Sequence, residues 1–351
     1  MSEALLAAVR SGDIAESERL LDAGADANAA LHAAAERGPL ALVELLIRRG
    51  AIEWRPDETG RTPLEAARAG GASDRGAIVE LLDRPVIRDP EFRAAVAAIH
   101  AGDVPALERI VEDEPRLLHE RIREPDCYRD APREQYFLDP QLLWFVADNP
   151  HLVETMPANI VEVTRALLAR GADGRDFTLE LVMTSAPARV QGHQIPLMQT
   201  LVAAGAVATP EAIDATLAHR ELEAVRALGH PLTPSIAAAF GLDEALRGLL
   251  ASATPAEVQM AFALAVINDR LEASRVTLDA GADVNAFLPM HSHSEALHQA
   301  ALTDDVELLE LLVERGARLD VRDTLWNGTP YGWAVHAGRT RAAAYLAKTA
   351  D

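Results

Sequence analysis

The stretch LLDAGADAN at residues 20–28 returns far along the chain as LDAGADVN at residues 278–285. Related phrases, each with leucine or valine at helical spacing followed by a glycine, occur as LLIRRGAIE at 45–53, LLARGAD at 167–173, LVAAGAVA at 201–208 and LLVERGARLD at 311–320. Glycine can adopt the left-handed conformation that ends an α-helix without a clash of its side chain. The recurring phrase therefore predicts the same kind of helix end at six places in the chain.

A second phrase precedes these helices. It is rich in alanine and reads AALHAAA at 29–35, TPLEAARAG at 62–70, EALHQAAL at 295–302 and TPYGWAVHAG at 329–338. A threonine hydroxyl can accept a hydrogen bond from an exposed amide at a helix N-terminus, and the proline that follows fits the first turn. Alanines let two helices approach closely, and the leucines of the next helix then cover the apolar side. Together the two phrases predict a repeated pair of helices.

These segments resemble the ankyrin repeat, whose signature is T-P-L-H-x-A with a period near 33 residues. The signature matches at Thr62–Ala67 and more loosely at Glu295–Ala300 and Thr329–Ala334. The G-A-D-x-N phrase at Gly24–Asn28 and Gly281–Asn285 looks like the repeat end of that family. The resemblance, which is to ankyrin-repeat proteins of the bacterial type, implies stacked helix pairs. It also implies that His298 makes a structural hydrogen bond between loops.

The spacing of the helix ends predicts how many pairs there are. Gly171 and Gly205 are 34 residues apart, whereas the 76 residues from Gly205 to Gly281 hold three shorter pairs. Dividing the whole chain in this way gives about eleven pairs of roughly 32 residues each. No pair can bury its own apolar face, so neighbours must stack into one continuous core. The expected fold is an all-α, ankyrin-like helix-pair solenoid of about eleven repeats.

The closeness of the match divides the chain into three segments. Residues 1–84 and 254–351 are regular ankyrin-like repeats, and residues 85–253 are degenerate helix pairs. Inserts interrupt the degenerate segment at 113–140, which contains four prolines, and at 148–159, which falls inside a helix pair.

Composition limits the function classes. A formal net charge of −21 argues against a general nucleic-acid binder and against docking on anionic lipid, since both need a cationic surface. The single cysteine, Cys127, permits no intrachain disulfide and fits a reducing cytoplasm. The sequence lacks the G-x-S-x-G, H-E-x-x-H, C-x-x-C and Gly-rich phosphate-binding motifs. We therefore predict no catalytic residues, no cofactor, no metal and no membrane span.

Candidate binding residues lie where loops depart from the repeat. The chain is poor in aromatic residues, yet several apolar, aromatic or histidine side chains gather in the loops at 285–294 and 320–328 and in the first insert: Phe287, Met290, His291, His293, Trp326, Tyr136 and Phe137. Exposed aromatic side chains can anchor a protein partner. The alternative is that these rings only pack the loops onto the solenoid. Trp333, which replaces a small residue within a first helix, is expected in the core.

These observations predict a non-catalytic scaffold that binds another protein through its concave face and loop tips. The C-terminal loops would be the principal anchor, with Tyr136 and Phe137 as a second one. Two other interpretations stay open. One is an enzyme whose site lies in the inserts of residues 113–200. The other is an acidic regulatory or inhibitory subunit, whose charge would attract a basic partner.

Overall fold

The structure, a computed structural model, describes residues 2–53, 55–57, 59–83, 87–122, 137 and 139–349. In these residues the regular secondary structure is helical, and the β-pairing consists of two isolated bridges, Arg121 with Gln141 and Phe287 with Glu295. The all-α class is confirmed. Cys127 and Tyr136 lie outside the described residues.

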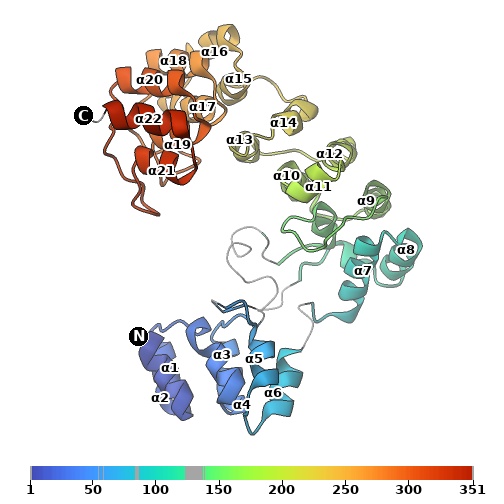
Figure 1. The fold of residues 1–351 in the computed structure, drawn as a ribbon. Helices are drawn as coiled ribbons and strands as arrows, with labels where there is room; N and C mark the ends of the chain where they lie inside the picture. Colours follow the sequence, from blue (N-terminus) through green and yellow to red (C-terminus); the bar gives the residue numbers. More distant parts are fainter. Residues whose placement is uncertain are drawn as a thin grey trace. The chain divides into compact units, whose positions relative to one another are not determined.

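The first half of the chain contains five helix pairs (Figure 1). Four are α-helical: α1 (Ser2–Ser11) with α2 (Ile14–Asp22), α3 (Asn28–Arg37) with α4 (Leu40–Arg48), α5 (Pro63–Ala69) with α6 (Arg75–Leu82), and α7 (Pro90–Ala101) with α8 (Val104–Asp113). After the short 3₁₀ helix η1 (Pro115–Leu118), the fifth consists of the 3₁₀ helix η3 (Leu142–Ala147) and α9 (Ile160–Ala169).

Six more pairs follow. They are α10 (Arg175–Met183) with α12 (Gln194–Ala203), α13 (Pro210–Ala218) with α14 (Leu222–Leu228), α15 (Pro234–Phe240) with α16 (Asp243–Leu250), α17 (Pro255–Ile267) with α18 (Leu271–Asp279), α19 (Ala296–Thr303) with α20 (Val306–Glu314), and α21 (Pro330–His336) with α22 (Thr340–Thr349). A short helix, α11 (Ala186–Val190), lies inside the first of these. The described residues thus form the eleven pairs that the spacing predicts.

The chain divides into two compact units. Residues 1–146 and 157–173 form unit 1, and residues 147–156 and 174–351 form unit 2. This division follows the packing of the helices. The three segments 1–84, 85–253 and 254–351 instead follow the quality of the sequence match, and the division into three segments stays a prediction. In the stretch 83–90, the described residues 83 and 87–90 all belong to unit 1.

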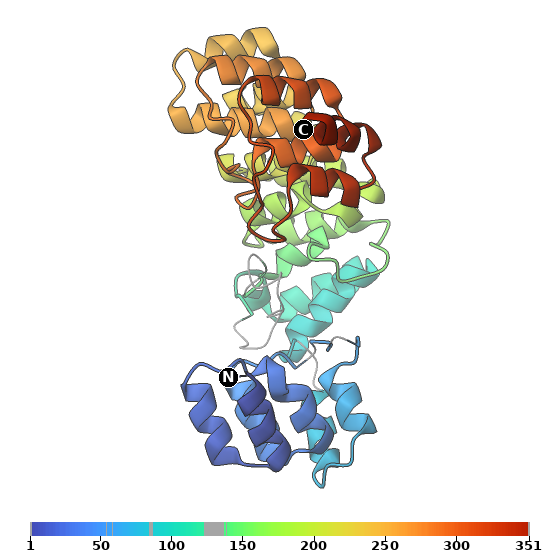
Figure 2. The same ribbon diagram turned by 60° about the vertical axis from the view of Figure 1, so that its left-hand side comes forward.

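Within each unit the helices form two layers. In unit 1 the first helices α1, α3 and α5 lie side by side, and α2, α4 and α6 form the second row (Figure 1). In unit 2 the first helices α15, α17, α19 and α21 pack in sequence, with α16, α18, α20 and α22 behind them (Figure 2). The first helices pack most closely because their contact faces are alanines, such as Ala30 and Ala34 of α3 and Ala237 and Ala238 of α15, all fully buried.

The helix ends form as the sequence phrases predict. Thr62 and Thr254 cap α5 and α17 in complete capping boxes, with Glu65 and Glu257 returning the hydrogen bond. The left-handed glycine is illustrated by Gly281 after α18, with φ of +100°. A side chain is strained in this conformation, so glycine is favoured at the position.

One predicted helix takes a different form. The segment that begins the pair before α9 is a 3₁₀ helix, η3, where the pattern led us to expect an α-helix. Gln141 is held in the bridge to Arg121, and Asp148, with φ of +45°, stops the helix six residues later. A 3₁₀ helix rises more per residue than an α-helix, so the six residues between these two fixed points reach further than one α-helix of the same length would. No helix in the described part of the chain is long and apolar enough to cross a membrane.

The stack of helix pairs gives a stability prediction. Leu308 and Leu312 of α20 are fully buried in the core of unit 2. Truncating either to alanine should leave a cavity and lower the free energy of unfolding by about 2–5 kcal/mol. Glu310→Ala, on the exposed face of the same helix, is the matched control and should change it by less than about 0.5 kcal/mol. Urea unfolding followed by circular dichroism measures both; equal midpoints for leucine and control variants would contradict the packing.

Candidate functional site

Two loops of unit 2 extend beside the first helices α19 and α21, and we name them the first finger (residues 285–294) and the second finger (residues 320–328) (Figures 1 and 2). The first finger is closed by the bridge between Phe287 and Glu295 and anchored by Leu288, which is fully buried. The amide of Thr324 donates to the carbonyl of His293 at 2.9 Å, which ties the fingers together.

The second finger is built around one carboxylate. Asp323 is 3% exposed; its Oδ1 accepts the amides of Leu325 at 2.9 Å and Trp326 at 2.7 Å. Its Oδ2 accepts the amide of Gly328 at 2.7 Å and the indole Nε1–H of Trp333 at 2.9 Å. Burial raises the pKa of this carboxyl, but the four donors outweigh burial and bring the pKa to about 2. At neutral pH the finger is therefore ordered around a fixed negative charge.

The fingers are also joined to the helices by contacts that recur in unit 1. The Nε2 of His298 donates to the carbonyl of Gly328 at 3.1 Å, just as His32 contacts the carbonyl of Arg61 at 2.9 Å. Asn285 Oδ1 accepts the amide of Arg318 at 3.0 Å, because its side chain reaches the next repeat. The expected hydrogen bond of His298 between loops is confirmed.

A cavity of about 640 Å³ lies between the fingers and the two first helices. Its lining consists of rings with a few small or polar residues: His291, His293, Gln299, Leu302, Trp326, Gly328, Gly332, Trp333 and His336. The ring of His293 stacks on Trp333 at 5.8 Å between centroids and meets Trp326 edge-on at 5.4 Å. The two indoles lie 5.6 Å apart. This volume falls within the usual range for ligand sites.

Burial shapes the electrostatics around the cavity, where imidazoles lie beside the buried carboxylate of Asp323. Burial, and then the neighbouring His293 and His219, lower the pKa of His291. Burial likewise lowers the pKa of His298. Both imidazoles are therefore neutral at physiological pH. No group of three histidine, cysteine or carboxylate side chains in the described residues is arranged to hold a metal ion.

The ankyrin repeat family model matches residues 26–55 and 295–324, and the second match covers α19, α20 and the start of the second finger. Both segments are therefore ankyrin repeats. The chain is 39% identical over 75 residues to protein PhlB of Serratia liquefaciens. The aligned region covers 21% of this chain and 32% of that protein. The chain is also 39% identical over 79 residues to the human ARF GTPase-activating protein GIT1, covering 20% of this chain and 10% of that one.

The chain thus spans about a third and a tenth of the length of these two relatives. The GTPase-activating activity in the name of the human relative is a property of that protein. Ankyrin repeats generally mediate protein–protein interaction.

The ankyrin fingers bring together only some of the predicted binding residues. His291, His293 and Trp326 all line the cavity. Phe287 is 45% exposed on the first finger and Met290 is half-buried, but neither is among the lining residues. Trp326, 69% exposed, is the most accessible ring of the group.

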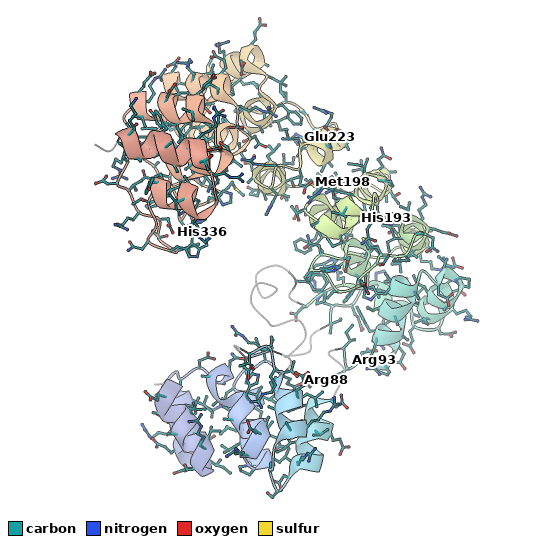
Figure 3. All side chains as sticks on the ribbon, in the orientation of Figure 1. Arg88, Arg93, His193, Met198, Glu223 and His336 are labelled. Carbon is teal, nitrogen blue, oxygen red and sulfur yellow. The ribbon has the colours of Figure 1, made fainter. Side chains whose placement is uncertain are left out.

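The sequence interpretation missed the helical side of the cavity. Trp333, expected in the core, is instead half-buried and lines the cavity, because its indole must reach Asp323. His336, labelled in Figure 3, lies one turn further along α21, and Gln299 and Leu302 share a face of α19. The spacing of three residues in each helix was a readable signal, since residues three apart share a helix face.

In the predicted second anchor at residues 113–140, Phe137 is buried rather than exposed. Phe137 has no exposed surface and packs edge-on against Phe145, with 5.4 Å between ring centroids. Its ring therefore packs the insert onto unit 1, as the alternative interpretation has it, and is not accessible to a partner. Tyr136 lies outside the described residues.

The insert at 148–159 contains an acid–histidine pair of the kind that the enzyme interpretation would require. Asp148 Oδ2 lies 2.8 Å from Nδ1 of His151. However, Oδ1 of Asp148 accepts the amides of Leu152 at 2.6 Å and Val153 at 3.2 Å. These bonds hold the turn of the loop, so the pair is explained by local structure.

A comparable cavity of about 500 Å³ lies between α1, α3 and the loop at residues 52–61 of unit 1. Its lining is polar and internally paired: Arg61 contacts Glu36 at 3.2 Å and Asp57 at 3.6 Å. The aromatic lining is thus a property of the C-terminal repeats rather than of every ankyrin groove in the chain.

The close approach of Gly328 to Trp333 gives a prediction for this site. A Cβ at position 328 would lie 2.9 Å from Cδ1 of Trp333 and 3.0 Å from Oδ2 of Asp323. Gly328→Ala should therefore displace the Trp333 indole and change the nuclear magnetic resonance (NMR) signal of its Nε1–H. Gly332→Ala is the control, since its Cβ would meet only Thr329 Oγ1 at 3.5 Å. Unchanged indole signals in both variants would contradict the geometry.

The buried carboxylate gives a pH prediction. The charged form of Asp323 is stabilised in the folded finger, so its contribution to stability is complete above the ordinary pKa of 3.8 and is lost as pH falls toward about 2. The Trp333 indole signal should stay constant from neutral pH to about pH 4 and change below it. Asp323→Asn should be less stable at neutral pH and lack this titration. A midpoint at or above 3.8 would contradict the assigned role.

Proposed function

We propose that the protein is a non-catalytic interaction scaffold that binds a segment of another protein between the fingers and first helices of its last two repeats. The aromatic cavity lined by Trp326 and Trp333 is the observation that carries the proposal. The proposed face is the concave face expected of ankyrin repeats. The single cysteine supports placing this interaction in the reducing cytoplasm.

The geometry favours binding because the anchor is ordered in advance. Trp326 belongs to a finger fixed by the bonds of Asp323, by Thr324 to His293, and by Gly328 to His298. An anchor that is already ordered loses little conformational entropy when a partner binds. Tryptophan is also among the residues that contribute most when buried in an interface.

The neighbouring surface extends this anchor. Phe287 on the first finger and the exposed Tyr331 of α21 are apolar side chains beside the cavity. We propose Phe287 and Met290 as rim contacts that exclude water, with Trp326, His291 and His293 at the centre. Such a rim adds complementarity rather than most of the binding energy.

The test compares Trp326→Ala with Leu325→Ala. Leu325 is 62% exposed in the same finger but does not line the cavity, so it is the matched control. Proteins captured from the native cell by the wild-type chain are identified and their affinities measured with all three forms. Trp326→Ala should weaken binding about 30-fold or more, and Leu325→Ala less than about threefold.

Circular dichroism should show that both variants keep the helical fold, because both side chains are largely exposed. If Trp326→Ala retains wild-type affinity for every partner captured, the cavity is not the binding site and the proposal is wrong.

A further inference from the structure

The chemistry of the cavity indicates which side chain of the partner it receives, an inference that rests on the function proposed above. The rings of Trp326, Trp333 and His293 line the cavity and pack against one another, with centroids 5.4–5.8 Å apart, and 69% of Trp326 is exposed. The face of an aromatic ring carries negative potential and its edge positive potential. A cavity walled by such faces attracts a cation, and tryptophan does so most strongly.

The buried carboxylate strengthens this preference at one wall. Asp323 Oδ2 accepts the Nε1–H of Trp333 at 2.9 Å, so a full negative charge lies at the edge of that indole. Hydrogen-bonded groups polarise one another in a low-dielectric interior. The bond therefore moves electron density toward the ring and makes the indole more attractive to a cation that enters the cavity.

The cavity also presents acceptors without a competing cation. Gln299 lines the cavity and is 8% exposed, and its Nε2 donates to Ser294 Oγ at 3.1 Å, which leaves Oε1 as its remaining polar atom. Among the described residues, no hydrogen bond is made to that oxygen or to the ring nitrogens of His291, His293 and His336. The lining contains no lysine or arginine. Arg322, on the second finger, donates instead to the carbonyl of Asn327 at 2.8 Å.

An anionic occupant is disfavoured by the same features. It would need protonated imidazoles, whereas the pKa of His291 is lowered by burial and by His293. It would also approach the charge of Asp323 and a chain of net charge −21. A basic segment is attracted by that net charge before contact and by the rings after contact.

We propose that the cavity binds an arginine side chain of the partner protein, with the guanidinium stacked on the exposed indole of Trp326, next to Trp333, and donating to Gln299 Oε1. Arginine fits better than lysine, since its planar group stacks on aromatic faces and offers five donors in a rigid fork. The lysine ammonium is compact and more strongly hydrated.

The test uses defined probes and the intact chain. The indole Nε1–H signals of ¹⁵N-labelled protein are followed by NMR while the peptide acetyl-Ala-Arg-Ala-amide is added. The comparison peptides replace arginine by lysine, by leucine, or by citrulline, which has the shape of arginine without its charge. The arginine peptide should shift the signals of Trp326 and Trp333 and bind roughly 3- to 30-fold more tightly than the citrulline peptide.

Variants separate the cavity from the general attraction of an acidic protein. Trp326→Ala and Gln299→Leu should each weaken binding of the arginine peptide, whereas Trp326→Phe should retain part of it and Leu325→Ala all of it. If lysine binds as tightly as arginine, or citrulline or leucine as tightly as either, the inference is overturned. An absence of shifts from the arginine peptide overturns it as well.

These outcomes are distinguishable from failure of the proposed function. A captured partner whose binding depends on Trp326, combined with no preference for the arginine peptide, would retain the scaffold and reject the arginine. A partner whose binding is indifferent to Trp326 would reject the cavity as the anchor for a protein.

Discussion

Burial between neighbouring repeats is the constraint on which the rest of the structure depends. A single helix pair of this protein exposes too much apolar surface to be stable alone, so each pair must cover the next. The alanine faces of the first helices, such as Ala300 and Ala301 of α19, allow this at short distance. Because those helices are held closely, the loops between pairs emerge as neighbouring fingers, and side chains from two repeats can share one cavity.

Much of this architecture could be predicted because the repeat determines it locally. Glycine after the second helix, threonine and proline before the first, and alanine between them each specify a backbone conformation or a packing distance within a few residues. Those signals are short-range, so they survive even where the central repeats are degenerate. The 3₁₀ helix at Leu142–Ala147 escaped prediction, since its length is limited by a bridge from Arg121, twenty residues earlier in the chain.

The candidate site was only partly predictable for the same physical reason. His291, His293 and Trp326 stand out in the sequence because they interrupt the repeat, and the structure brings all three to one cavity. Phe137 also interrupts the repeat, yet its ring is buried against Phe145, and composition alone does not separate a ring that packs from one that binds. Trp333 was assigned to the core, because nothing local indicates that a carboxylate ten residues earlier will hold its indole at the cavity wall.

The hydrogen bonds of Asp323 distinguish the C-terminal fingers from the corresponding loop of unit 1. In both, a carboxylate accepts amides of its own loop: Asp57 from Thr59 and Arg61, and Asp323 from Leu325, Trp326 and Gly328. In unit 1 the side chain of Arg61 then pairs with Glu36 inside the cavity, and a partner would have to break that pair. In the C-terminal repeats the remaining bond goes to an indole edge, so the charge is satisfied by a ring that itself lines the cavity. The same fold thus closes one groove with an ion pair and leaves the other lined with aromatic rings.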